Sequence, residues 1–130
     1  MSVRGPAAVP RVEIDLAKVE GNARAVVEMC AKHGIRVAGV TKVTCGHPDV
    51  ARAMLRGGVR WIAESRLANL ERLRRAGVSC ETILLRAPML HEARDAVRFA
   101  DMTLVSSVET ARALGEAASA RGTEHRVVLM

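Results

Sequence analysis

Strand-forming and helix-forming segments alternate along this 130-residue chain with a nearly constant period. Five short apolar runs rich in β-branched residues centre near positions 38, 61, 84, 104 and 128, so that 20 to 24 residues separate successive centres. The segments between them carry apolar residues three or four positions apart, which is typical of amphipathic helices. Strands that alternate with helices, without the Asn-Gly turns of hairpins, pair in parallel through right-handed crossovers. The alternation therefore predicts an α/β fold.

The boundaries of the expected elements follow from apolar runs, capping residues and helix-ending glycines. The predicted strands are Val12–Ile14, Arg36–Thr41, Val59–Ala63, Thr82–Arg86, Met102–Val105 and Arg126–Met130. Helices are predicted from the N-cap Asp15 to about Lys32, from Pro48, from Ser65, after Pro88, and from the N-cap Ser106 to about Ala120. Ser106 and Glu109 have the spacing of a capping box.

The spacing of the strands matches successive βα units of a (β/α)₈ barrel. An open doubly wound sheet has the same alternation, although no Gly-x-Gly-x-x-Gly follows any strand here. A complete barrel takes about 250 residues. We therefore expect residues 11–130 to form the N-terminal portion of a barrel with parallel strands, truncated after about five barrel strands, behind a flexible leader at residues 1–10. The final strand of this portion, Arg126–Met130, would then be an apolar strand at the edge of the sheet.

Composition restricts the compartment and the partners. The three cysteines are odd in number and lack metal-ligand spacing, which favours a reducing compartment without a disulfide framework or a metal site. The N-terminus lacks the pattern of a signal peptide and no apolar stretch is long enough for a membrane span, so we expect neither a secretory leader nor a membrane anchor and expect a cytoplasmic location. The net charge of +6 leaves a nucleic-acid-binding module open, but arginines are interspersed with acids and aromatic residues are scarce. Nucleic acid and membranes are therefore not expected as partners.

Candidate site residues follow from the rule that parallel α/β folds bind ligands at the carboxyl ends of their strands. That rule selects Lys42, Thr44, Glu64, Arg86 and Ser106. Lys42 is one of only three lysines, and it ends an apolar strand that would partly bury it. Burial disfavours the ammonium form, and a free amine is what a Schiff base with a carbonyl compound requires.

Each of these residues also has a structural interpretation. Lys42 could extend its amine out of the strand end into solvent. Glu64 could pair with a helix arginine, Arg86 could bridge neighbouring loops, and Ser106 could serve only as a helix cap. The residues alone leave these alternatives open.

Several sequence blocks resemble the alanine racemase-like family of pyridoxal-phosphate enzymes, which is also called fold-type III. The start of that family is similar to Arg11-Val-Glu-Ile-Asp-Leu and to Gly39-Val-Thr-Lys42 with the following Cys45-Gly-His. Further blocks at 51–59, 64–69, 84–90 and 100–102 are together most similar to the alanine/ornithine racemase branch. The resemblance covers about residues 10–130, and it implies that Val12–Ile14 lies outside the barrel.

The resemblance implies a cofactor and a reaction. Lys42 would hold pyridoxal 5'-phosphate as a Schiff base and, when released, act as the base on one face of an amino-acid substrate. Alanine racemases also use tyrosines, and this chain has none, so a basic substrate such as ornithine is favoured over alanine. The complete protein would be an amino-acid racemase for which a homodimer stays open, with this N-terminal portion inactive alone. The alternative is a non-catalytic pyridoxal-phosphate carrier of the same barrel type.

Overall fold

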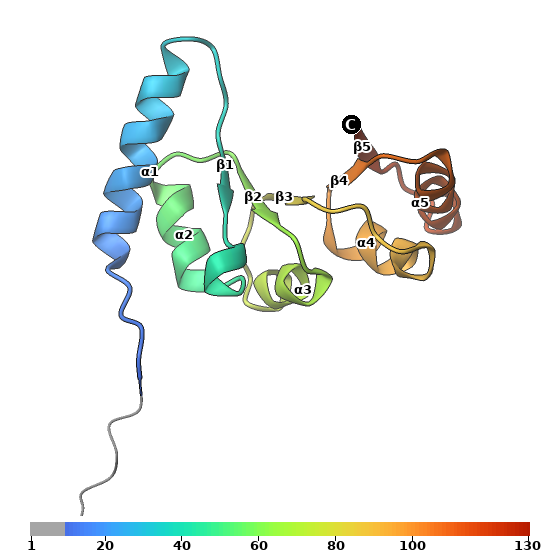
Figure 1. Ribbon diagram of the computed structural model, residues 1–130, viewed down its shortest axis with the longest axis horizontal. Coiled ribbons are helices and arrows are strands. Elements are labelled where there is room, and N and C mark those ends of the chain that lie inside the picture. Colours follow the sequence, from blue (N-terminus) through green and yellow to red (C-terminus); the bar gives the residue numbers. More distant parts are fainter. Residues whose placement is uncertain (1–9) are drawn as a thin grey trace, which may run out of the picture.

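The computed structural model of the protein describes residues 10–130, in which one parallel sheet organises the fold. Its strands, in spatial and in sequence order, are β1 (Ala38–Val40), β2 (Trp61–Glu64), β3 (Glu81–Leu84), β4 (Met102–Val105) and β5 (Arg126–Leu129). The helices lie on the outer side of the curved sheet (Figure 1). A doubly wound sheet would reverse its strand order and carry helices on both faces. The order is therefore that of successive barrel strands, and the predicted parallel α/β fold is confirmed.

Five α-helices and two short 3₁₀ helices connect the strands. They are α1 (Leu16–Ala31), η1 (Lys42–Thr44), α2 (Pro48–Arg56), α3 (Leu67–Arg75), η2 (Leu90–Glu92), α4 (Ala93–Phe99) and α5 (Val108–Ala120). Asp15 caps α1 as predicted, because its side chain accepts a hydrogen bond from the backbone N–H of Lys18 at 3.1 Å. Among residues 10–130, no helix has the length and apolar character needed to cross a bilayer.

The hydrophobic core lies between the sheet and the outer helices. Ile62, Leu84 and Val105 of the strands are buried there together with Leu70 of α3 and Leu114 of α5. Each such side chain contributes about 1.5–3 kcal/mol when it is fully removed from water. Because side chains alternate along a strand, the neighbours of these residues project from the opposite, inner side of the sheet.

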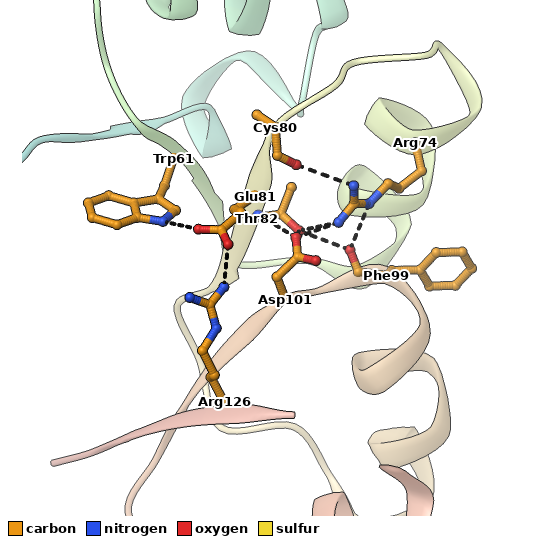
Figure 2. Close-up of polar contacts among 8 residues, drawn as sticks. All are labelled: Trp61, Arg74, Cys80, Glu81, Thr82, Phe99, Asp101 and Arg126. Atoms are coloured by element: carbon orange, nitrogen blue, oxygen red, sulfur yellow. Dashed lines mark hydrogen bonds and ion pairs between the residues drawn. The ribbon is translucent and has the colours of Figure 1, made fainter. Parts of the chain in front are cut away.

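On that inner side, Glu81 joins three strands near their amino-terminal ends. Its carboxylate accepts hydrogen bonds from Nε1 of Trp61 at 2.7 Å and from Nη2 of Arg126 at 2.9 Å (Figure 2). The bond from Trp61 is the main cause that lowers the pKa of Glu81, and the bond from Arg126 adds to it. This cluster, made of Trp61, Glu81 and Arg126, links β2, β3 and β5 at the end of the sheet opposite the predicted site.

On the helix side, Asp101 and Arg74 tie α3 to the starts of β3 and β4 (Figure 2). Oδ2 of Asp101 accepts hydrogen bonds from the backbone N–H of Thr82 at 2.7 Å, from the Thr82 hydroxyl at 3.1 Å and from Arg74 at 2.5 Å. Arg74 also donates to the Thr82 hydroxyl at 3.2 Å and to the carbonyls of Cys80 and Phe99. The Asp101 carboxylate thus accepts a hydrogen bond from the backbone of the buried residue Thr82 and also pairs with the positive charge of Arg74 on α3.

Three predicted features are wrong, and the ends of four predicted strands differ from the observed ends by one or two residues. Val12–Ile14 forms no strand, because no strand among residues 10–130 pairs with this segment. Val12 is accordingly 89% exposed. The helix predicted from Ser65 begins at Leu67. Ser107, not Ser106, caps α5, since the Ser107 hydroxyl accepts a hydrogen bond from the backbone N–H of Thr110 at 3.2 Å. Most of the predicted leader lies outside the described residues.

Candidate active site at the carboxyl ends of the strands

The predicted site residues all lie at one edge of the sheet. Lys42 and Thr44 belong to η1, which follows β1, and Glu64 is the last residue of β2. Arg86 lies two residues after β3, and Ser106 directly follows β4. Because the strands run parallel, their carboxyl ends meet at the same edge, where barrel enzymes bind ligands.

The side chain of Lys42 is exposed at this edge. The expectation that the strand would partly bury it is wrong, because β1 ends at Val40 and the chain turns into η1. Within residues 10–130, the Lys42 amine makes no hydrogen bond and no ion pair. The amine is therefore accessible and is not held by a carboxylate.

Thr41 anchors the turn that carries Lys42. Its side chain is fully buried, and its backbone N–H donates to the carbonyl of Ala63 at 3.1 Å. The Thr41 carbonyl accepts three hydrogen bonds, from the backbone N–H groups of Thr44 and Gly46 and from the Thr44 hydroxyl, at 3.0, 3.1 and 3.0 Å. The Thr44 hydroxyl therefore helps to close the turn. The three hydrogen bonds to the Thr41 carbonyl hold the backbone in place directly before Lys42.

Helix α3 holds the other end of the turn. Arg72 of α3 donates to the carbonyl of Cys45 at 2.8 Å. Gly46 has a φ of +63°, and a Cβ placed on it would lie 2.7 Å from Cβ of Asn69 and 3.1 Å from the Asn69 carbonyl oxygen. Only glycine fits this backbone conformation together with this close approach. The turn is therefore packed directly against α3.

Gly46→Ala is expected to destabilise the fold more than Gly77→Ala. Both glycines have positive φ, at +63° and +69°, but a Cβ on Gly77 would meet nothing within 4 Å. The backbone penalty of roughly 1–2 kcal/mol is common to both variants, whereas only Gly46→Ala adds the clash with Asn69. Urea unfolding of the two variants measures the difference, and equal losses would show that α3 does not constrain the turn.

The carboxylate of Glu64 points into the fold. Glu64 is fully buried, and it shares the helix-facing side of β2 with Ile62. Its Oε2 accepts a hydrogen bond from the Thr41 hydroxyl at 3.2 Å. Its Oε1 accepts from the backbone N–H of Ser65 at 2.7 Å and from the Ser65 hydroxyl at 3.3 Å. Glu64 therefore contacts the turn of Lys42 and pairs with no arginine of residues 10–130.

Arg86 bridges two loops, as one interpretation of the sequence proposed. Its Nε donates to the carbonyl of Ser65 at 3.0 Å, and its two Nη groups bind the carboxylate of Glu92 at 2.9 and 2.7 Å. Glu92 also accepts from the backbone N–H of Met89 at 2.8 Å. The Arg86 guanidinium, followed by this backbone bond, lowers the pKa of Glu92 to about 2, and Glu92 in turn raises the pKa of Arg86.

The Glu92 carboxyl is expected to titrate near pH 2, and Arg86→Gln is expected to raise that midpoint. Because the folded-state pKa is below the unfolded-state value of about 4.3, the interaction stabilises the fold fully above that value, and the stabilisation is lost as the pH falls through about 2. NMR titration of the carboxyl carbon measures the midpoint. Arg52→Gln breaks the exposed pair between Arg52 and Asp49 and is the control. An unchanged midpoint in Arg86→Gln would contradict this assignment.

Ser106 is exposed next to the start of α5, and its side chain makes no hydrogen bond within residues 10–130. In the same part of the chain, no three His, Cys, Asp or Glu side chains are grouped so that they could hold a metal ion. The strand-end rule missed Thr41, Ser65 and Arg72, which hold this edge together. Thr41 could have been found, because side-chain alternation places it on the same helix-facing side of the sheet as Gly39.

Sequence comparison relates the chain to known amino-acid racemases. A family model described as "Alanine racemase, N-terminal domain" matches residues 14–130. Lysine racemase of Thermotoga maritima is 40% identical over 107 residues, which cover 82% of this chain and 30% of that protein. Ornithine racemase of Acetoanaerobium sticklandii is 34% identical over 121 residues, which cover 93% of this chain and 34% of that protein. The chain thus spans about a third of the length of these relatives.

Solved structures share the fold. Alanine racemase of Clostridium difficile 630 superposes with a TM-score of 0.71 at 23% identity, covering 86% of this chain and 29% of that one. Alanine racemase of Streptomyces lavendulae gives 0.73 at 26% identity, covering 88% and 30%. PipY of Synechococcus elongatus PCC7942, solved with PLP bound, gives 0.69 at 21% identity, covering 88% and 53%. The predicted correspondence to the N-terminal barrel portion is confirmed.

Proposed function

The chain belongs to the alanine racemase N-terminal domain family, and on this premise we propose that the protein is a pyridoxal-phosphate-dependent racemase of a basic amino acid such as lysine or ornithine. Two relatives support the substrate class, a lysine racemase at 40% identity and an ornithine racemase at 34%. The observation that carries the proposal is the accessible amine of Lys42 at the carboxyl edge of the first strand.

The surroundings of Lys42 fit covalent attachment of an aldehyde cofactor. An amine that attacks a carbonyl carbon has to be accessible and free of a tight ion pair, and Lys42 meets both conditions. The other two lysines lie on or next to α1, where Lys18 is 3.9 Å from Asp15 and Lys32 caps the end of the helix. Lys42 is the lysine that lies at the carboxyl edge of the strands, so the cofactor is assigned to it.

Lys42, Thr41 and Arg86 then have distinct parts in the reaction. Pyridoxal phosphate, when bound, supplies a conjugated ring that stabilises negative charge at the substrate Cα. Nζ of Lys42, once the amino-acid substrate has taken its place on the cofactor, would accept the proton from Cα on one face of the substrate, and inversion requires a second group that donates a proton on the opposite face. The turn closed on Thr41 limits where Nζ can reach. Arg86 is bonded to Glu92 and the Ser65 carbonyl, so it orders the loops around the site.

A second function is a non-catalytic pyridoxal-phosphate carrier of the same barrel type. A solved structure that shares the fold, PipY of Synechococcus elongatus PCC7942, has PLP bound, which supports this alternative. A carrier needs the attachment at Lys42 but no proton transfer at Cα. The cytoplasmic location and the homodimer expected from the sequence stay predictions under either function.

Proton exchange at Cα separates the two functions. The full-length protein loaded with pyridoxal phosphate is incubated with one enantiomer of lysine, ornithine or alanine in deuterated water. A racemase replaces the α-proton by deuterium and removes the optical rotation, and protein without cofactor is the control. Cofactor absorbance without any exchange would rule out the racemase and support the carrier.

A further inference from the structure

Glu64 is a buried carboxylate without a cationic partner among residues 10–130. Its side chain is 0% exposed, and its hydrogen-bond donors are the Thr41 hydroxyl and the hydroxyl and backbone N–H of Ser65. Burying a carboxylate among neutral groups costs free energy that an apolar residue of similar size would not cost. Networks of this kind hold their members in one arrangement when every member is satisfied. Glu64 therefore holds Thr41 and Ser65 in one arrangement.

The arrangement fixes the residue that precedes Lys42. The hydroxyl of Thr41 is bound by Glu64, its N–H by the carbonyl of Ala63, and its carbonyl by the turn that contains Lys42. Of these three contacts, the bond to Glu64 is the one that determines the side-chain rotamer of Thr41. Losing it would free the Thr41 side chain at the point where β1 passes into η1.

The same carboxylate connects a second strand end to the edge. Oε1 of Glu64 orients the backbone of Ser65, and the carbonyl of Ser65 accepts a hydrogen bond from Arg86. A continuous chain of hydrogen bonds thus runs from the turn of Lys42 through Thr41, Glu64 and Ser65 to Arg86 at the end of β3. Glu64 is the member of this chain that contacts both sides.

We propose that Glu64 is a positioning residue for Lys42, because it fixes Thr41 and the end of β2 and thereby sets the region that the Lys42 amine reaches. The inference rests on the proposed attachment of pyridoxal phosphate to Lys42. Displacing a reacting group by about 1 Å can cost as much as about 100-fold in rate, so losing this anchor has a measurable effect on attachment without removing any group that touches the cofactor.

The test measures how selectively Lys42 is labelled. Full-length protein is stripped of cofactor, exposed briefly to pyridoxal phosphate, reduced with borohydride and analysed by peptide mapping. The labelling of Lys42 is divided by that of Lys18 and Lys32, which serve as references within the same molecule. In Glu64→Gln an amide NH₂ replaces one acceptor oxygen: the amide oxygen can still accept from the Ser65 N–H, whereas the Thr41 hydroxyl loses its acceptor and can keep the contact only by turning round to accept from the NH₂.

Matched variants of the partner residue isolate the hydrogen bond. Thr41→Val replaces the hydroxyl by a methyl group of similar size, and Thr41→Ser retains the hydroxyl. The labelling ratio is expected to fall by roughly 10-fold to 100-fold in Glu64→Gln and in Thr41→Val, and to stay near the wild-type value in Thr41→Ser. In the double variant that combines Glu64→Gln with Thr41→Val, the labelling ratio is expected to fall no further than in the more affected single variant, because both changes break the same contact.

Each result decides the question. Wild-type selectivity that is retained in both Glu64→Gln and Thr41→Val would overturn the positioning role, even if their melting temperatures drop. If Glu64→Gln does not fold, the comparison of Thr41→Val with Thr41→Ser decides alone. A wild-type ratio near one would instead overturn the attachment at Lys42 and thus the proposed function, so the two failures are distinguishable.

Discussion

Lys42→Ala is expected to abolish the borohydride-stable attachment of pyridoxal phosphate to the protein and to reduce racemisation by about 10²-fold to 10⁴-fold. Alanine has no nucleophile, so no covalent bond to the cofactor can form at this position. The same change removes the base on one face of the substrate, and a positioned base contributes a factor of that size. Mass spectrometry of the reduced protein measures the attachment, and loss of optical rotation measures the racemisation.

The chain provides its own controls for this experiment. Lys18→Ala and Lys32→Ala remove the other two lysines, which lie on or next to α1 and not on the turn after β1. Both variants are expected to keep the adduct and the activity. An adduct that persists at another residue in Lys42→Ala would contradict the assignment of the cofactor.

Asp101→Ala is expected to lower the free energy of unfolding by about 2–4 kcal/mol. The change leaves the buried backbone N–H of Thr82 without its acceptor and leaves Arg74 without its carboxylate (Figure 2). An unsatisfied buried donor costs about 1–3 kcal/mol, and a hydrogen bond to a charged group about 1.5–3 kcal/mol. The ion pair adds little to this, because both side chains are about a third exposed. Urea unfolding measures the loss.

An exposed ion pair on the other side of the sheet is the control for Asp101. Arg126→Gln breaks the bond between Arg126 and Glu81, whose side chains are 50% and 45% exposed. The expected loss is below about 1 kcal/mol, because exposed ion pairs contribute little. Similar losses in the two variants would show that burial of the Thr82 backbone does not set the cost.

The sequence predicted those parts of the fold that repeat. Regular alternation gave the parallel sheet, and Asp15 marked the start of α1 correctly. Val12–Ile14 has the composition of a strand but no neighbour to pair with among residues 10–130, and β-propensity alone does not form a strand. Ser106 and Ser107 are equally suited to cap a helix, so the choice between them depends on where β4 ends.

The edge on which the candidate site lies was predictable, but the direction of each side chain was not. Lys42, Glu64 and Arg86 all follow the strand-end rule, yet the first is exposed, the second is buried and the third is bonded to Glu92. These differences arise from the turn after β1, from the face of β2 on which Glu64 lies, and from a carboxylate on a later segment. None of them is visible in the spacing of the residues.

The strand order also has a consequence for folding. Each strand pairs with the one that follows it along the chain, so every step of sheet growth closes a loop of similar length. The entropy of closing a loop grows only logarithmically with its length, and no single step here is much costlier than the others. The sheet can therefore grow outward from its first strand, one unit after another, as the ribosome releases the chain. The turn that carries Lys42 would have its partners β2 and α3 in place before β4 and β5 are made.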